Sequence, residues 1–249
     1  MSKQRRVASL GLIAMSLLVA CTSSATSPSA ATSPSSASST SGSLPAWYSQ
    51  FGNGVQVSLQ GTTVVLQTND LPDHPSPYWG VGKALYEAPQ AGMQVNPNSI
   101  ITQNLTFRVP LSPQIAATPG DTPLGAIGVA VNGVVFFNQY AAGRQPLTGE
   151  ILSFDRFNGH PQQSGQYHYH VDPLWLTQSS GSRLIGVLTD GFAVYGMLDS
   201  NGVAPGDLDV CHGHVGTTPE FATATYHYHV TAAAPYISGC FRGTAGTVG

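Results

Sequence analysis

The chain has 249 residues and a formal net charge of −3, and charged residues make up 8 % of it, against roughly a quarter in a typical soluble domain. No run of basic residues follows the first six positions, so the charge pattern gives no reason to expect a nucleic-acid partner. No phosphate-binding glycine-rich loop and no Gly-x-Ser-x-Gly elbow occur, which argues against nucleotide binding and against a serine hydrolase.

The first residues predict an exported protein. A basic start precedes an apolar segment, residues 7–20, that is too short to span a bilayer and is typical of a secretory signal. The segment ends in Leu-Val-Ala-Cys21, which resembles the lipobox of bacterial lipoproteins. We therefore expect residues 1–21 to be a lipoprotein signal with a lipidated Cys21. The lipid would anchor the protein to a membrane of the bacterial cell envelope, facing the periplasm or the exterior. An ordinary cleaved signal followed by an unrelated cysteine is the alternative.

The rest of the chain predicts a tether followed by one domain. Residues 22–43 are almost wholly Ser, Thr, Ala and Pro and indicate a disordered tether. The folded domain is expected to span residues 44–249, beginning near three aromatic residues, Trp47, Tyr48 and Phe51.

The pattern within this domain is that of β-strands. Alternating or wholly apolar runs predict strands within 55–59, 62–67, 100–109, 126–138, 184–188 and 192–198. Asn132-Gly133 and Asp190-Gly191 are two-residue turn signals that predict hairpins. Helical turns are expected only at 84–88 and 173–178. The sequence thus predicts an all-β, sandwich- or barrel-like single domain with short hairpins.

One tetrapeptide occurs twice and indicates an internal repeat. Tyr167–His170 and Tyr226–His229 are both Tyr-His-Tyr-His, each is followed by Val, and each has a Gly-His pair before it and a Pro after it. The spacers differ in length, and solenoid arrays need three or more units. We therefore expect an internal pseudo-two-fold repeat within one domain.

The tetrapeptide places two residue types on opposite faces of a strand. Residues i and i+2 of a strand point to the same side, so the two tyrosines of each copy would pack in the core and the two histidines would project together from the other face. If the two halves pack face to face, their histidines would meet in one shared pocket.

Clustered histidines predict a metal site. The candidate ligands are His160, His168, His170, His214, His227 and His229, followed by His212. Imidazole-rich sites suit zinc, copper or iron, and a site with only three or four protein ligands leaves a position open for water. The metal could serve a hydrolase, an oxidoreductase or a non-catalytic carrier, so whether the protein is an enzyme stays open. A metal-free polar core and a metal-free cleft are the alternatives. His74, between prolines and far from the cluster, is expected at the surface.

Three aspartates and two cysteines lie near the histidines. Asp155, Asp172 and Asp209 either orient imidazoles or form turns. With Cys21 lipidated, Cys211 and Cys240 remain as an even pair in an exported protein, which predicts a disulfide. In the alternative, Cys211 is a thiolate ligand beside His212 and His214.

The chain resembles the YHYH protein family over roughly residues 50 to 245. The resemblance rests on the linked segments 128–134, 159–161, 167–170, 190–196, 208–214, 226–230 and 235–241. It implies a secreted or lipid-anchored β domain but no particular reaction. Many members carry an acid where this chain has Val210.

A second function fits the same sequence. The low charge, the predicted β architecture and the tryptophans Trp47, Trp79 and Trp175 are also consistent with a non-enzymatic envelope module. Such a module would bind a glycan, another envelope polymer, a small molecule or a protein, and its histidines would be structural.

Overall fold

The computed structural model describes residues 42–249. The predicted signal, its Cys21 and all but the last two residues of the predicted tether lie outside these described residues. Within residues 42–249, no helix is long and apolar enough to cross a membrane.

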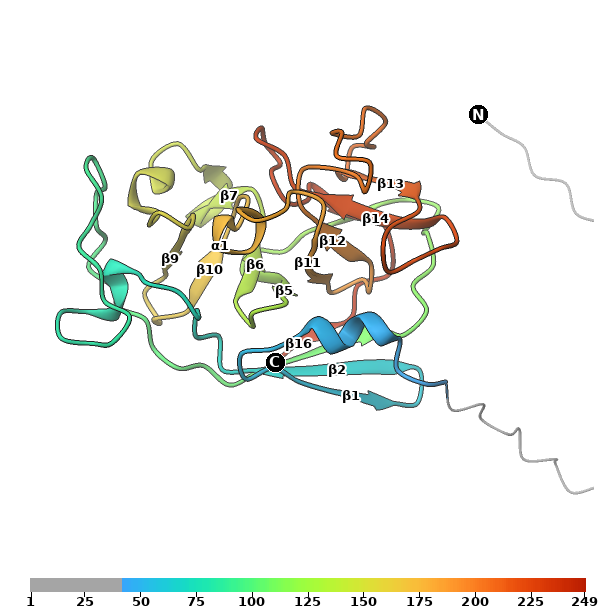
Figure 1. Cartoon of the computed structure of the whole chain (residues 1–249), viewed down its shortest axis with the longest axis horizontal. Coiled ribbons are helices and arrows are strands. Elements are labelled where there is room, and N and C mark those ends of the chain that lie inside the picture. Colours follow the sequence, from blue (N-terminus) through green and yellow to red (C-terminus); the bar gives the residue numbers. More distant parts are fainter. Residues whose placement is uncertain (1–41) are drawn as a thin grey trace, which may run out of the picture. The chain divides into compact units, whose positions relative to one another are not determined.

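The main element is an eight-stranded sheet in the order β13-β14-β12-β11-β5-β6-β10-β9 (Figure 1). Its strands are β5 (Ala126–Ala130), β6 (Val135–Phe137), β9 (Gly159–Pro161), β10 (Tyr167–Tyr169), β11 (Leu184–Leu188), β12 (Ala193–Tyr195), β13 (Gly213–Gly216) and β14 (Thr225–His229). The all-β prediction is confirmed, and among the described residues no sheet closes into a barrel.

Smaller elements surround this sheet. A four-stranded antiparallel sheet has the order β1-β2-β3-β16, and two short ribbons pair β15 with β4 and β7 with β8. These strands are β1 (Gln56–Gln60), β2 (Thr63–Thr68), β3 (Leu105–Pro110), β4 (Gly120–Asp121), β7 (Tyr140–Ala141), β8 (Gln145–Pro146), β15 (Cys240–Phe241) and β16 (Thr247–Val248). The helices are single turns: η1 (Ala46–Gln50), η2 (Pro77–Trp79), η3 (Ala142–Arg144), η4 (Glu150–Ser153) and α1 (Leu174–Thr177).

The eight-stranded sheet consists of two equivalent halves. Read outward from its centre, one half runs β5-β6-β10-β9 and the other runs β11-β12-β14-β13. In each half an antiparallel hairpin is followed by a parallel neighbour, β10 beside β6 and β14 beside β12. The halves join where β5 and β11 pair antiparallel. The predicted internal repeat is therefore confirmed, and it includes the hairpins that precede each tetrapeptide.

Glycines at equivalent positions let the two halves approach closely at this junction. A Cβ atom on Gly128 would lie 2.5 Å from the carbonyl oxygen of Val187, and one on Gly186 would collide with the carbonyl oxygen of Val129. Because backbone atoms cannot move aside as a side chain can, both positions need glycine.

Both sheets contribute to one hydrophobic core. Leu66 and Phe107 of the four-stranded sheet and Val129 and Val187 of the eight-stranded sheet are all fully buried. Close contact between the sheets is also made at a hairpin turn, where the Thr68 hydroxyl donates to the carbonyl oxygen of Gly133 at 2.8 Å. The core and this hydrogen bond thus hold the turn between β5 and β6, and β6 pairs with the histidine-bearing strand β10.

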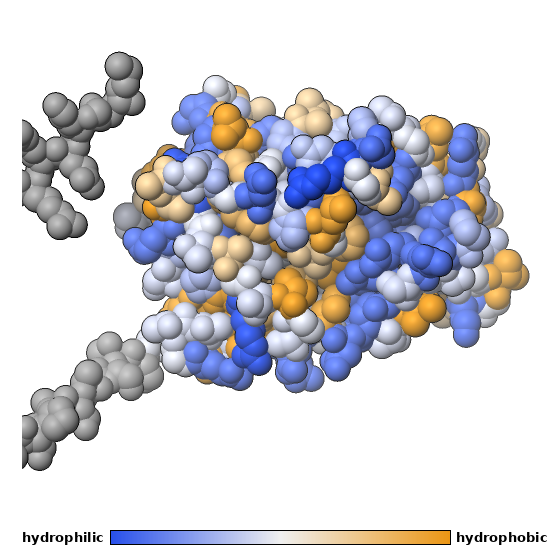
Figure 2. All heavy atoms as spheres, turned by 180° about the vertical axis from the view of Figure 1, so that it is seen from behind, coloured by the Kyte–Doolittle hydropathy of each residue, from blue (hydrophilic) through white to orange (hydrophobic). Residues whose placement is uncertain are grey.

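The predicted strands are present with shifted ends. Of the region predicted as a strand at 100–109, only the part within β3 (Leu105–Pro110) forms one. The helical turn predicted at 173–178 is α1. Residues 84–88 form turns and a bridge rather than a helix. On the face shown in Figure 2, apolar residues are interspersed with polar ones.

Candidate metal centres

The histidines form two separate clusters, one in each half of the sheet. His160, His168 and His170 form the β10 cluster, and their ligand atoms lie within 4.8 Å of one another. His214, His227, His229 and Asp199 form the β14 cluster, which meets the same criterion. Each group could hold a metal ion.

The expectation of one shared pocket is wrong, and the strand order explains why. The histidine-bearing strands β10 and β14 lie near opposite edges of the sheet, with β6, β5, β11 and β12 between them (Figure 1). Five strand spacings of about 4.8 Å put them roughly 24 Å apart along the sheet. The halves lie side by side instead of face to face, so each forms its own histidine cluster.

Strand pairing brings three histidines together in each half. His168 lies directly opposite His160 in the β9–β10 pair, and His227 lies opposite His214 in the β13–β14 pair. The third histidine is two residues further along the same strand, on the same face. The Gly-His pair and the tetrapeptide therefore supply one cluster together.

In the β10 cluster, backbone carbonyls orient the two imidazoles of the tetrapeptide. His168 Nδ1 lies 3.1 Å from the Gln166 carbonyl oxygen, and His170 Nδ1 lies 2.6 Å from that of Asn138. A carbonyl oxygen can only accept a hydrogen bond, so each Nδ1 carries the proton. The neutral ring then has its lone pair on Nε2.

The third imidazole of the β10 cluster has the same tautomer for a different reason. The Ser153 hydroxyl donates to the Glu150 carbonyl oxygen at 2.7 Å. Its oxygen must therefore accept from His160 Nδ1, also at 2.7 Å. The Asn96 amide lies farther from this nitrogen, at 3.4 Å. His160 Nε2 is accordingly left without a proton.

The β14 cluster repeats this arrangement. His227 Nδ1 donates to the Thr225 carbonyl oxygen at 2.9 Å, and His229 Nδ1 donates to that of Gly196 at 2.7 Å. These acceptors occupy the positions equivalent to Gln166 and Asn138. Nε2 of both rings therefore carries the lone pair, as in the first half.

A carboxylate takes the place of the serine in this half. His214 Nδ1 lies 2.8 Å from Asp207 Oδ1 and donates to it. The hydrogen bond from this imidazole lowers the pKa of the exposed Asp207. Ser153 and Asp207 each stand seven residues before the histidine of the Gly-His pair.

The result is a set of lone pairs that face one another in each cluster. The Nε2 atoms of His168 and His170 are 3.1 Å apart, and so are those of His214 and His227. His229 Nε2 is buried and has no hydrogen-bond partner among the described residues. Facing lone pairs repel each other unless a cation lies between them, and a metal ion bound by Nε2 of each ring would remove the repulsion.

An acid completes the β14 cluster. Asp199 Oδ1 lies 3.3 Å from Nε2 of both His214 and His229. A carboxylate oxygen is also an acceptor, so this cluster offers three nitrogen atoms and one oxygen to a single cation. Three imidazoles and a carboxylate match the tetrahedral ligand sets that proteins use for zinc.

Burial keeps five of the six imidazoles neutral. Desolvation, followed by the neighbouring His170, lowers the pKa of His160 to about 3, and desolvation lowers that of His170 to about 4. Desolvation also lowers the pKa of His229 to about 4, and it depresses the pKa values of His168 and His227. A metal ligand must be deprotonated, so these rings are in the binding form at neutral pH.

The tyrosines of the tetrapeptides hold the opposite face, as predicted. Tyr167 and Tyr169 are fully buried, and the Tyr167 hydroxyl donates to Asp155 Oδ2 at 2.7 Å. In the other half the Tyr226 hydroxyl donates to Asp209 at 3.1 Å. Each strand is thus anchored by a tyrosine–aspartate bond behind its histidines.

Two of the three aspartates beside the histidines are turn formers. Asp155 Oδ1 accepts from the backbone N–H groups of Phe157 and Gly159, and Asp209 Oδ1 accepts from those of Cys211 and Gly213. Within the described residues, neither they nor Asp172 hydrogen-bonds to a ligand imidazole. Of the two interpretations, the turn-forming one holds for Asp155 and Asp209.

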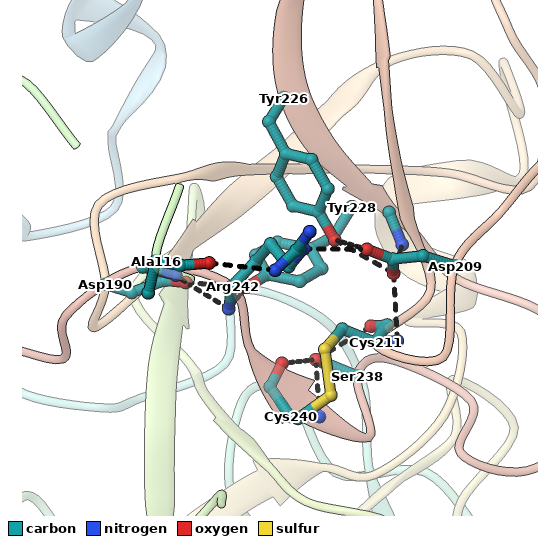
Figure 3. A network of polar contacts seen from close by, with 11 residues as sticks. Ala116, Asp190, Asp209, Cys211, Tyr226, Tyr228, Ser238, Cys240 and Arg242 are labelled. Carbon is teal, nitrogen blue, oxygen red and sulfur yellow. Dashed lines mark hydrogen bonds and ion pairs between the residues drawn. A yellow bond between two sulfur atoms is a disulfide. The ribbon is translucent and has the colours of Figure 1, made fainter. Parts of the chain in front are cut away.

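A polar network stabilises the second half behind its histidines (Figure 3). The Tyr228 hydroxyl donates to buried Asp190 at 2.6 Å, and the Arg242 guanidinium donates to Asp209 and to the Ala116 carbonyl oxygen. The Cys211–Cys240 disulfide is present beside this network. Cys211 is therefore not a thiolate ligand.

Two other histidines lie outside the clusters. His212 lies in the turn before β13 and has a positive φ of 68°; Asn158, in the equivalent turn before β9, has a φ of 67°. The Nδ1 atom of His212 lies 3.1 Å from the Thr231 hydroxyl. The prediction that His74 lies at the surface is wrong. It is fully buried against the tyrosine face of β10, and its Nε2 lies 2.9 Å from the Tyr169 hydroxyl.

A pocket of about 520 Å³ opens onto the β10 cluster. All three of its histidines line the pocket, together with Glu150, whose Oε2 lies 3.7 Å from His170 Nε2. The sequence interpretation did not include Glu150, Ser153, Asp199 or Asp207. Only the shared seven-residue offset of Ser153 and Asp207 could have pointed to two of them.

Comparison with known proteins assigns the family. The sequence model of the YHYH protein family matches residues 106–204 and 197–243, which is more than half of the chain. The chain belongs to the YHYH protein family. The match spans both histidine clusters and begins in β3, so residues 50–105 and 244–245 of the expected resemblance lie outside it. Comparison with curated proteins and with solved structures gave no significant match.

The lowered histidine pKa values predict that the metal-free YHYH domain loses stability in acid. An unfolded chain protonates its histidines near pH 6.5, whereas the folded state holds His160 neutral down to about pH 3 and His229 down to about pH 4. Protons therefore favour unfolding below pH 6.5, by up to about 1.4 kcal/mol for each unit of pKa depression. Urea unfolding of chelator-treated protein should give a free energy of unfolding that falls from pH 7 to pH 4.

The control for this prediction is His160→Asn, whose side-chain amide can still donate to Ser153. This variant lacks one histidine whose pKa is lowered in the folded state, so its free energy of unfolding should fall less steeply from pH 7 to pH 4. Asp70 and Asp190, whose pKa values are raised by burial, act in the opposite direction but equally in both proteins. Equal slopes for the two proteins would contradict the prediction.

Proposed function

We propose that this YHYH protein binds one transition-metal ion, zinc, copper or iron, in each of its two histidine clusters. The observation that carries the proposal is the orientation of the six imidazoles. Each donates its Nδ1 proton outward to a fixed acceptor. In all but His160, Nε2 lies 3.1 to 3.3 Å from another ligand atom of the same cluster. Outward hydrogen bonds of this kind fix the tautomer and ring orientation of metal-ligating histidines.

Zinc fits the β14 cluster best. Its four donors are three imidazole nitrogens and one carboxylate oxygen, and zinc accepts this set in a tetrahedral arrangement without a preference set by d electrons. Imidazole also suits copper and iron, so the donor set supports all three ions.

Two metal-free interpretations are less well supported. A structural polar network would pair donors with acceptors, whereas the Nε2 atoms here meet other acceptors at 3.1 to 3.3 Å. A binding module that uses an aromatic strip would expose its tryptophans. Trp47 is buried, and Trp79 and Trp175 are partly buried.

We also propose that the protein works at the bacterial cell envelope. The support is the sequence of its first 21 residues, which combines a basic start, a short apolar segment and a lipobox-like end at Cys21. A lipid on Cys21 and the serine-rich tether would hold the domain near a membrane surface. The disulfide is consistent with an oxidising compartment.

Metal content is the first test. Untagged protein loaded with zinc and freed of excess metal should contain two zinc ions per chain by elemental analysis. His168→Ala/His170→Ala and His227→Ala/His229→Ala should each lower the content to one, and His212→Ala should leave it at two. Bound metal should also raise the melting temperature, since a ligand at 1,000 times its Kd stabilises by about 4 kcal/mol. A zinc content near zero, with no copper or iron binding either, would refute the proposal.

The serine–aspartate exchange predicts unequal affinities. A carboxylate behind a ligand imidazole increases its basicity, and loss of such a partner typically weakens binding about 10- to 100-fold. The β14 cluster, with Asp207 behind His214, should therefore fill first in a zinc titration. Asp207→Ser should weaken its tighter site by about this factor, and Ser153→Asp should strengthen the weaker one. Unchanged affinities in both variants would show that this exchange has no such effect.

Lipidation can be tested in cells. Bacteria fed a radiolabelled fatty acid should transfer label to the full-length protein and keep it in the membrane fraction. Cys21→Ser should abolish the labelling and release the protein. A wild-type protein that carries no label would contradict the anchor.

A further inference from the structure

The two clusters differ in where their acid lies. Asp199 belongs to the ligand set of the β14 cluster, at 3.3 Å from two of its Nε2 atoms. Glu150 is outside the ligand set of the β10 cluster and approaches only His170, at 3.7 Å. The β14 cluster therefore offers four protein ligands, whereas the β10 cluster offers three with a carboxylate beside them. Structural zinc sites are closed by four protein ligands, and catalytic sites keep a position for water.

The pocket over the β10 cluster gives a substrate access to that position. It has a volume of about 520 Å³, and the three histidines and Glu150 form part of its wall. A volume of this size falls in the range of small-molecule sites. The fourth side of the cluster thus faces a space that can hold both water and a substrate.

The lining of the pocket is uncharged apart from Glu150 and the histidines. It contains no lysine or arginine, and its other polar side chains are mainly amides and hydroxyls: Asn96, Asn98, Tyr140, Ser153, Gln162 and Gln163. Arg144, next to the lining residue Gly143, lies over the Tyr140 ring and donates to the Thr122 carbonyl oxygen. Sites for phosphates usually contain arginine or lysine, so this lining fits an uncharged polar substrate.

Helix η4 (Glu150–Ser153) links the acid to the cluster. Its Ser153 orients His160, and the Ser153 hydroxyl is held in turn by the Glu150 carbonyl oxygen. One short turn therefore sets both the direction of an imidazole and the position of the Glu150 carboxylate. No equivalent of this carboxylate is needed in the β14 cluster, where Asp199 takes the fourth ligand position.

We propose that the β10 cluster is a hydrolytic centre for an uncharged carboxylic ester or amide, with Glu150 as the residue that transfers the proton, and that the β14 cluster is structural. This inference rests on the metal binding proposed above. The metal ion would polarise the substrate carbonyl and lower the pKa of a neighbouring water.

The hydrolysis needs only water, the substrate and the Glu150 carboxylate beside the metal. A water molecule in the open position gives one proton to the Glu150 carboxylate, and its oxygen bonds to the carbonyl carbon of the substrate. The bond from that carbon to the alcohol oxygen or amine nitrogen then breaks. Glu150 returns the proton to the leaving group, so the products are a carboxylic acid and an alcohol or amine. General acid–base catalysis of this kind contributes about 10²- to 10⁴-fold.

The test uses the zinc-loaded full chain with 4-nitrophenyl acetate as the probe. We expect zinc-dependent release of 4-nitrophenol above the rate of the chelator-treated protein. Glu150→Gln, which keeps the shape but not the carboxylate, should lower kcat about 100-fold or more while two zinc ions stay bound. His212→Ala should keep the wild-type rate. The anionic probe 4-nitrophenyl phosphate should be hydrolysed more slowly than the acetate.

The outcomes separate this inference from the proposal on which it rests. Two bound zinc ions without zinc-dependent ester hydrolysis would overturn the hydrolytic role and leave metal binding intact. A Glu150→Gln variant as fast as the wild type would overturn the role of Glu150, and a preference for the phosphate would overturn the substrate class. Absence of bound zinc, copper and iron would overturn both proposals.

A second measurement covers the case in which Glu150→Gln does not fold. In wild-type protein loaded with cobalt(II) in place of zinc, acetohydroxamate should change the visible absorption of one of the two ions, because only one has an open position. No change, or a change in both, would overturn the division into an open and a closed centre.

Discussion

The structure depends on one hydrogen bond made six times, from an imidazole Nδ1–H to an acceptor outside the cluster. Four of the acceptors are backbone carbonyl oxygens, at Gln166, Asn138, Thr225 and Gly196. A backbone carbonyl cannot reverse its role, so the tautomer of the ring is set by the fold itself. The inward Nε2 lone pairs, the shortage of donors around them and the fit to a cation all follow from this constraint.

Duplication gives two similar centres with different surroundings. The β5–β6–β10–β9 and β11–β12–β14–β13 halves share strand order, turns and the tyrosine–aspartate anchors. They differ in residues that lie between the strands: Ser153 against Asp207 behind the first imidazole, and Glu150 against Asp199 beside the cluster. The strands fix the imidazoles, and the segments between the strands supply the acids by which the two clusters differ.

The sequence predicted which side chains share a face of each strand, but not how the two halves are arranged in the sheet. The alternation of the tetrapeptide predicted buried tyrosines and grouped histidines, and both are present. Whether the halves share one pocket depends on strand order, which no local pattern encodes; the central β5–β11 pairing separates them. His74 is buried because a distant segment covers the tyrosine face of β10. Asp199 comes from a loop with no fixed spacing to the histidines that it faces.

Anomalous X-ray diffraction from crystals of the zinc-loaded protein, measured on both sides of the zinc absorption edge, tests the central claim most directly. The account predicts two peaks, one among His160, His168 and His170 and one among His214, His227, His229 and Asp199, each about 2.0–2.1 Å from the Nε2 atoms. It would be contradicted by clusters without a peak whose imidazoles have turned Nδ1 inward, or whose Nε2 atoms hydrogen-bond to ordered water.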